Sequence, residues 1–295
     1  MDTNRKKTDV IKPYIYLSPW IIGFIFFTGG PLIVSILLSF TKWNLLGEPE
    51  FVGLENYKNL FSGNSLMLET IKITILFTFL NVSVTTISSL CLAILLNFKL
   101  KFIKIFEIIY FIPAVVPAVV MAGVFTLMFN KEMGVINYLL GLLGIQSVNW
   151  LNSGNMVWIV LAIASIFTYS TGQMMLIFNS SLKEVPIELY EASEIDGAST
   201  WVKFKNITLP SISPIILFNV VTATVNSFNT SFNLIYPLTG GGPGNATKVL
   251  SLAIYENAFH YFDMGIASTF AVILFIIVAF FGFLQFRLSR DSVNY

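Results

Sequence analysis

Long apolar stretches separated by short charged segments dominate the chain. Reading from one charged residue to the next leaves six long charge-free intervals, at 13–41, 73–98, 108–130, 133–182, 206–247 and 264–286. A helix that crosses the hydrocarbon core of a bilayer needs about 20 mostly apolar residues. Each interval can hold such a helix, so the pattern predicts an all-α integral membrane protein.

The fourth interval is long enough for two spans, but its first part is not continuous. The segment from Gly134 to Asn155 is interrupted by Gly141, Gly144, Gln146, Asn149 and Asn152. We interpret it as an interfacial segment followed by a loop. The sequence then predicts a single transmembrane domain over 1–295, with six helices near 14–40, 71–97, 106–129, 156–178, 212–235 and 264–286. Pro113 and Pro117 are expected to bend the third of them.

Composition supports a membrane location. Of the 295 residues, 55% are hydrophobic, 15% are aromatic and only 11% are charged. Soluble domains average roughly 25% charged residues. The chain therefore has too few charges to cover a soluble surface.

The basic residues are distributed unevenly between the two sides of the expected bilayer. With the amino terminus inside, twelve lie on the cytoplasmic side, namely Arg5, Lys6, Lys7, Lys12, Lys99, Lys101, Lys104, Lys183, Lys203, Lys205, Arg287 and Arg290. The other five lie outside or near the outer end of the second span, namely Lys42, Lys58, Lys72, Lys131 and Lys248. Cytoplasmic loops carry an excess of Lys and Arg, so we expect both termini to be cytoplasmic.

Several function classes are disfavoured by what the sequence lacks. A net charge of +1 without basic stripes argues against nucleic-acid binding. A single cysteine, Cys91, and a single histidine, His260, rule out thiolate zinc sites and multi-histidine metal sites. No Gly-Lys dipeptide occurs, which excludes a phosphate-binding P-loop. His260 and nearby Asp263 have no identifiable nucleophile partner, so we expect no enzyme activity, metal or cofactor in this chain.

The longest inner loop, 183–210, differs from the other connections. Pro186 suits the first turn of a helix and Gly197 suits a left-handed helix stop. A second short amphipathic segment, Ala198 to Leu209, precedes Pro210. The loop is predicted to form a helix, a tight turn and a second helix. On spacing alone, it fits a hairpin resting on lipid head groups as well as an element that docks on a partner.

This loop resembles the coupling motif of the membrane subunits of binding-protein-dependent ABC importers. That motif is Glu-Ala-Ala, three residues, Gly, nine residues, and Ile-x-Leu-Pro. The chain has Glu191-Ala192-Ser193, Gly197 and Ile207-Thr208-Leu209-Pro210 at the same spacing, departing only at Ser193. The stretches S-L-K-E-V-P-I-E-L-Y, F-V-G-L-E-N-Y-K-N-L-F and T-G-G-G-P-G-N-A-T are similar to the carbohydrate and glycerol-phosphate branch. The resemblance covers essentially the whole chain and is closest to the first, maltose-transporter-like, of two unlike subunits.

The resemblance implies a type I ABC importer transmembrane domain in the plasma membrane of a bacterium or archaeon. The implied partners are a second homologous permease subunit, a dimer of ATPases that binds ATP and Mg, an extracytoplasmic solute-binding protein, and membrane lipid. It also implies that the loop couples to the ATPase. The coupling residues would be Glu188, Glu191, Ala192, Ser193, Asp196, Gly197, Ile207, Leu209 and Pro210.

A polar stripe in the fifth predicted span is the candidate substrate path. Thr222, Asn226, Asn229 and Asn233 fall within an arc of about 60° at about 100° per residue. The fourth span adds Ser165, Thr168, Tyr169 and Gln173. Unpaired amides in hydrocarbon cost several kcal/mol, so the stripe faces either other helices or a water-filled path. We favour a path, with Tyr169, Gln173 and the four stripe residues lining it.

Polar and charged residues in the spans bear on the substrate class. Amide and hydroxyl groups with aromatic faces suit a sugar or oligosaccharide, and the spans lack basic residues that would meet a phosphate or uronate. A glycerol-phosphate-type or acidic saccharide substrate is the alternative within the same machinery. An ion-coupled secondary transporter is a further alternative, disfavoured because the centres of the spans lack ionisable residues.

Overall fold

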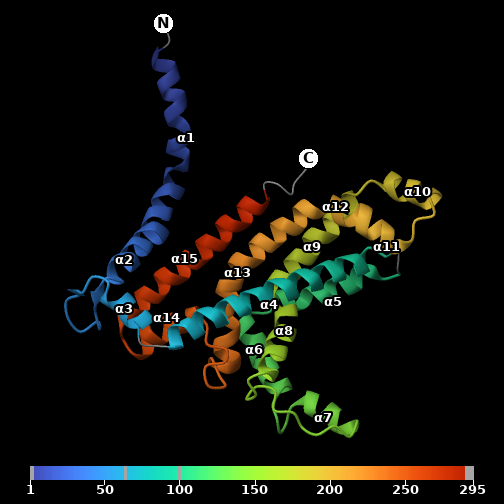
Figure 1. The fold of residues 1–295 in the computed structure, drawn as a ribbon. Helices are drawn as coiled ribbons and strands as arrows, with labels where there is room; N and C mark the ends of the chain where they lie inside the picture. The colour runs from blue at the N-terminus through green and yellow to red at the C-terminus, as the bar shows by residue number, and fades with distance from the viewer. Residues whose placement is uncertain (1–2, 63–64, 99–100, 290–295) are drawn as a thin grey trace. The chain divides into compact units, whose positions relative to one another are not determined.

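The structure is a computed structural model that describes residues 3–62, 65–98 and 101–289 (Figure 1). The described part is mostly helical, with two short strands. The chain divides into two compact units. The first lies within 1–64 and 254–274, and the second within 65–253 and 275–295.

The first unit contains a long amino-terminal helix and a small assembly of two strands and short helical segments. Its elements are α1 (Thr3–Phe24), a π-helical turn (Ile25–Gly29), α2 (Gly30–Leu38), β1 (Thr41–Lys42), β2 (Glu50–Phe51), α3 (Glu55–Ser62), a second π-helical turn (Glu256–His260) and the first part of α15 (Met264–Ser289). The two strands pair antiparallel, with Thr41 opposite Phe51.

Hydrogen bonds to one buried serine hold this small assembly together. The carbonyl oxygen of Ser39 accepts from Asn56 Nδ2 at 2.9 Å and from Thr269 Oγ1 at 3.2 Å. Asn56 also donates to the carbonyl of Thr41, and the hydroxyl of Tyr57 donates to Ser39 Oγ at 2.7 Å. Asn56 and Tyr57 belong to the F-V-G-L-E-N-Y stretch, which therefore has a structural role within this unit.

The second unit holds the remaining helices. Its elements are α4 (Ser65–Leu96), α5 (Ile103–Val115), α6 (Ala118–Met128), α7 (Val135–Leu142), α8 (Met156–Ile166), α9 (Tyr169–Glu184), α10 (Ile187–Ile195), α11 (Thr200–Lys203), a π-helical turn (Phe204–Thr208), α12 (Leu209–Ser211), α13 (Ser213–Thr239), most of α14 (Leu250–Tyr255) and the second part of α15.

Helices occupy all six segments that the sequence predicts to span a membrane. Within the described residues, three helices are long and apolar enough to cross a bilayer unaided, at Lys12–Leu38, Leu66–Leu96 and Met264–Gln285. Up to three more spans arise if each bent pair counts as one. These pairs are α5 with α6 at 99°, α8 with α9 at 50°, and the Thr200–Ser211 segment with α13 at 66°.

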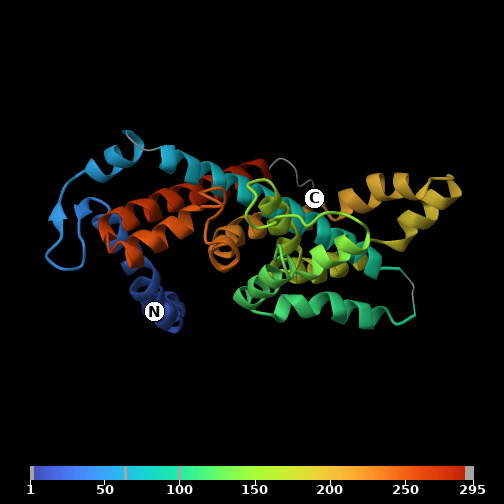
Figure 2. The same cartoon turned by 90° about the horizontal axis from the view of Figure 1, so that it is seen from below.

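The bend between α5 and α6 has a direct cause in the sequence. Val116 is extended, and Pro117 is the residue just before α6. Proline disfavours a helical conformation in the residue before it and cannot donate a backbone hydrogen bond. Figure 2 shows the resulting change of direction. The segment before the fourth predicted span contains α7 followed by a loop, as the broken apolar pattern indicated.

Polar contacts between helices hold the second unit together. Asn81 of α4 donates to Ser165 Oγ of α8 at 3.0 Å, and Ser89 Oγ of α4 donates to the carbonyl of Thr171 at 2.9 Å. Gly172 allows α9 to approach α5, because a Cβ at this position would lie 2.4 Å from the Cβ of Ala114. Small residues and interhelical hydrogen bonds of this kind are the usual means of packing helices in a bilayer.

Candidate functional site

The predicted coupling loop forms a helical hairpin that stands out from the bundle (Figure 2). Its first arm, α10, follows Pro186 and ends at Asp196. Gly197 then adopts a left-handed conformation, with φ of +73°. The Gly197 N–H donates to the carbonyl of Glu194 at 3.0 Å, and the Ala198 N–H donates to that of Ser193 at 2.9 Å. This pair of bonds is a Schellman motif, which closes a helix at a left-handed residue.

The second arm runs from α11 through a π-helical turn into α12. Ser199 caps its start, because Ser199 Oγ accepts a 3.4 Å hydrogen bond from the Val202 N–H. Ile212 is fully buried at the bend that follows α12. The arm is thus continuous with α13, apart from the 66° change of direction.

Two side-chain contacts join the arms of the hairpin. Lys203 Nζ lies 2.7 Å from Glu194 Oε1 in an ion pair, and the hydroxyls of Tyr190 and Thr208 are 2.8 Å apart. The hydrogen bond from Lys203, with the charge of its ammonium, holds the pKa of Glu194 below its usual value. We call these four residues the hairpin clasp. The clasp was not among the predicted site residues, although a tight turn at Gly197 brings the residues on either side of this glycine together.

The predicted coupling residues lie mostly on the exposed surface of the hairpin. Glu188, Glu191, Ala192, Asp196, Gly197 and Pro210 are exposed, whereas Ser193, Ile207 and Leu209 are half-buried. Apolar side chains of α10 are also uncovered, since Leu189 and Ile195 are 46% and 88% exposed. Trp201 of the second arm is 68% exposed. Apolar side chains beside carboxylates give the hairpin a surface suited to docking in a groove of a partner.

The predicted polar stripe lies on one face of α13. Thr222 and Asn226 are half-buried, and Asn229 and Asn233 are exposed. Thr222 Oγ1 donates back to the carbonyl of Phe218 at 2.9 Å. The amides of the three asparagines make no hydrogen bond to any residue that the structure describes. The opposite face is buried in the second unit, through Asn219, Ala223, Thr224, Ser227, Phe228, Ser231, Leu234, Ile235 and Leu238.

The fourth predicted span divides between packing and candidate path residues. Ser165 is fully buried and accepts from Asn81, so it joins α8 to α4 and does not face a path. Thr168 Oγ1 donates to the carbonyl of Ser165 at 2.9 Å, a local contact. Gln173 is half-buried on α9 and has no hydrogen-bond partner in the described ranges. The side chain of Tyr169 lies outside the described part of the structure.

The described residues contain no group of three or more His, Cys, Asp or Glu side chains that could hold a metal ion. Asp263 has a local structural role, because its Oδ1 accepts from the Ile266 N–H at the start of α15 at 3.0 Å. His260 is exposed and its ring contacts that of Tyr255 edge-on.

Comparison with known proteins gives one family and closely related chains. Residues 85–292 match the family described as binding-protein-dependent transport system inner membrane component. A probable ABC transporter permease protein of Bacillus subtilis, YesP, is 33% identical over 98% of this chain and 94% of its own length. The trehalose/maltose transport system permease protein MalF of Thermococcus litoralis is 33% identical over 94% of this chain and 93% of its own.

A solved structure has the same fold. It is a chain of a bacterial ABC transporter involved in the import of the acidic polysaccharide alginate. The TM-score is 0.84 at 21% sequence identity, covering 98% of this chain and all of that one.

Proposed function

The chain belongs to the family of binding-protein-dependent transport system inner membrane components, and on that premise we propose that it is the permease subunit of an ATP-driven sugar importer. It forms the path for a sugar or oligosaccharide that an extracytoplasmic binding protein delivers. A second homologous permease completes the path. A separate ATPase dimer, which binds ATP and Mg, supplies the energy through residues 183–210, and both termini lie in the cytoplasm.

The observation that carries the substrate proposal is the unpaired amide face of α13. Asn226, Asn229 and Asn233 expose donors and acceptors on a helix whose other face is packed. An amide left unpaired in hydrocarbon costs several kcal/mol, so this face meets water, a solute or another protein chain. Hydroxyl-rich solutes satisfy amide donors and acceptors together.

Two further observations support a neutral saccharide. The described helices that could span the bilayer carry their charged residues only near their ends, so the stripe has no cation for a phosphate or uronate. The related MalF protein is a trehalose/maltose permease by name. The alginate importer shares only the fold at 21% identity, and it is the missing cation in the stripe that makes an acidic substrate the less favoured alternative.

Uptake of labelled sugars into proteoliposomes that contain the assembled importer tests this proposal. Replacing Asn229 with Leu should lower uptake roughly threefold to tenfold, because each lost hydrogen bond is worth about 0.5–1.5 kcal/mol. The exposed loop residue Asn152 provides a matched control, since Asn152→Leu removes an amide away from the stripe.

The results distinguish a sugar path from helix packing and from ion-coupled transport. Loss of the assembled complex in Asn229→Leu, instead of loss of uptake, would show that the stripe packs helices. Uptake that proceeds without ATP or an ATPase would favour an ion-coupled transporter. Screening sugars against the cognate binding protein identifies the substrate.

A further inference from the structure

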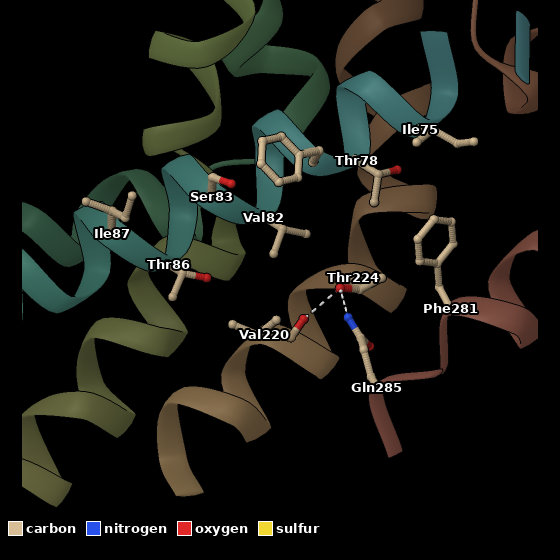
Figure 3. Close-up of a pocket in the computed structure, with 11 residues that line it drawn as sticks. Ile75, Thr78, Val82, Ser83, Thr86, Ile87, Val220, Thr224, Phe281 and Gln285 are labelled. Carbon is tan, nitrogen blue, oxygen red and sulfur yellow. Dashed lines mark hydrogen bonds between the residues drawn. The ribbon is translucent and has the colours of Figure 1, made fainter. Parts of the chain in front are cut away.

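A cavity of about 430 Å³ lies in the second unit between α4, α13 and α15 (Figure 3). Its volume falls in the range of about 300–1,000 Å³ that is typical of small-molecule sites. Seven of its lining residues come from α4, two from α13 and two from α15. None of them is charged.

The cavity is separate from the proposed sugar path. Its two residues on α13, Val220 and Thr224, each lie two positions from Thr222 of the polar stripe. At about 100° per residue, they point roughly 160° away from Thr222. The cavity therefore lies on the opposite side of α13 from the stripe.

Two threonine hydroxyls in the cavity wall have no partner. Several hydroxyls along α4 donate to the carbonyl four residues earlier, as Thr70, Thr74 and Thr85 do at 2.7 Å. Thr78 and Thr86 do not, and their buried Oγ1 atoms make no hydrogen bond to the described residues. Thr78 is only 7% exposed. Both residues line the cavity, and a change of χ1 rotamer would turn either hydroxyl toward an occupant.

The side-chain amide of Gln285 adds a third unpaired polar atom to the two threonine hydroxyls. Gln285 Nε2 donates to Thr224 Oγ1 at 2.7 Å, and Thr224 Oγ1 donates in turn to the carbonyl of Val220 at 2.8 Å. Figure 3 shows this chain of bonds. Gln285 Oε1 is buried and makes no hydrogen bond within the described part of the chain. The cavity thus offers two hydroxyl donors and one acceptor-only oxygen, each costly to leave unpaired.

Apart from Ser83, the rest of the wall is apolar and reaches the outer surface of the helices. Ile75, Val82 and Phe281 line the cavity, and Phe79 and Ile87 at its edge are 73% and 62% exposed. Around a membrane-spanning helix this surface meets lipid, not water. A charged head group finds no counter-charge among the lining residues. An uncharged lipid with two acceptor oxygens and one hydroxyl donor matches the unpaired atoms.

We propose that this cavity binds a neutral glycerolipid of the diacylglycerol type. Its two ester carbonyls accept from Thr78 and Thr86, and its free hydroxyl donates to Gln285 Oε1. Its acyl chains lie against the apolar wall and pass out over Phe79 and Ile87. The site gives the importer a lipid ligand that is independent of the sugar.

Photoaffinity labelling of the full chain in lipid nanodiscs tests the proposal without any transport measurement. A diacylglycerol with a photoreactive acyl chain should label peptides containing residues 75–87 and 281–285, with unlabelled diacylglycerol competing. A phosphatidylcholine probe with the same chains should label them at least several-fold less. Failure of the sugar proposal would leave these results unchanged.

Isosteric variants probe the hydrogen bonds. Thr78→Val and Thr86→Val should each raise the half-saturating lipid fraction about twofold to tenfold. Thr126→Val is the control, because Thr126 of α6 donates back to the Ala122 carbonyl and does not line the cavity. Equal labelling by the two probes, or labelling unaffected by both valine variants, would overturn the proposal. So would a photoreactive residue at Ile87 that captures the second permease subunit in place of lipid.

Discussion

Gly197 offers the sharpest test of the proposed coupling role of the hairpin, because the effect of a substitution there can be separated from side-chain packing. Its φ is +73°, and a Cβ added there would meet no atom within 4 Å. A substitution is therefore disfavoured by backbone conformation alone. A β-branched residue in the left-handed region costs about 1–2 kcal/mol, which corresponds to a roughly fivefold to thirtyfold change in the population of a state.

That cost is comparable with what holds the hairpin closed. The bond between Tyr190 and Thr208 is worth about 0.5–1.5 kcal/mol, and the ion pair of Glu194 is exposed. Gly197→Val should therefore re-aim α10 and lower ATP-driven uptake about fivefold to thirtyfold, with weaker co-purification of the ATPase. Uptake should fall least in Gly197→Asn and to an intermediate extent in Gly197→Ala, because Asn tolerates the left-handed region.

A second glycine gives a matched control. Gly144 has φ of +74°, and a Cβ added there would also meet no atom within 4 Å. The same pair of closing bonds ends α7 at this glycine. Gly144→Val carries the same backbone cost but lies away from the hairpin, so it should leave ATPase co-purification unchanged. The reasoning is refuted if Gly197→Val transports at the wild-type rate with the ATPase bound. It is also refuted if the loss of uptake among the Gly197 variants increases with side-chain size and not with the cost of the left-handed conformation.

Three further predictions follow from particular contacts. In the hairpin clasp, Lys203→Glu should reduce ATPase co-purification, and the double reversal with Glu194→Lys should restore it. Because Lys203 lowers the pKa of Glu194, the stabilisation by this ion pair is fully present above the normal carboxyl pKa and is lost as the pH falls through the lowered value, whereas the bond between Tyr190 and Thr208 is unaffected. In α9, Gly172→Leu should force α9 from α5 and reduce the yield and Tm of folded protein, whereas Gly123→Leu, with nothing within 4 Å, should not. For topology, with Cys91→Ser, a cysteine at Asn152 should react with an impermeant thiol reagent only from outside and one at Thr200 only from the cytoplasm; the reverse pattern would contradict the proposed orientation.

Fold and family were predictable because they depend on the lengths of apolar segments and on short motifs, both of which can be read from the sequence. Long apolar intervals predict helices in lipid, and the family resemblance drawn from Glu191, Gly197 and Pro210 is confirmed by the family match. Pro186 and Gly197 likewise predict the two ends of α10. The bend at Pro117 was expected, since proline acts locally. The 50° bend between α8 and α9 was not, because no proline marks it.

Side-chain partners were less predictable, since they depend on which face of each helix packs. Ser165 and Gln173 are both polar residues of the fourth span, yet Ser165 is fully buried against α4 and Gln173 is half-buried. Thr222 and Thr224 are two residues apart, but only Thr224 takes part in the buried chain of bonds with Gln285. Apolar periodicity is weak in a helix surrounded by lipid, because lipid-facing and core-facing positions are both hydrophobic.

The segment from Thr200 to Thr239 connects the two proposed functional surfaces. Its first part is the second arm of the hairpin, and its last part carries the asparagine stripe. The bend between them is hydrogen-bonded on both sides, because the Ile212 N–H donates to the Thr208 carbonyl at 3.1 Å and the Ile212 carbonyl accepts from Ile216 at 2.9 Å. Ile212 itself is fully buried. In the proposed importer, we expect a displacement of the hairpin by the ATPase to pass through this buried residue into α13 and to reorient the face that presents its amides to the sugar.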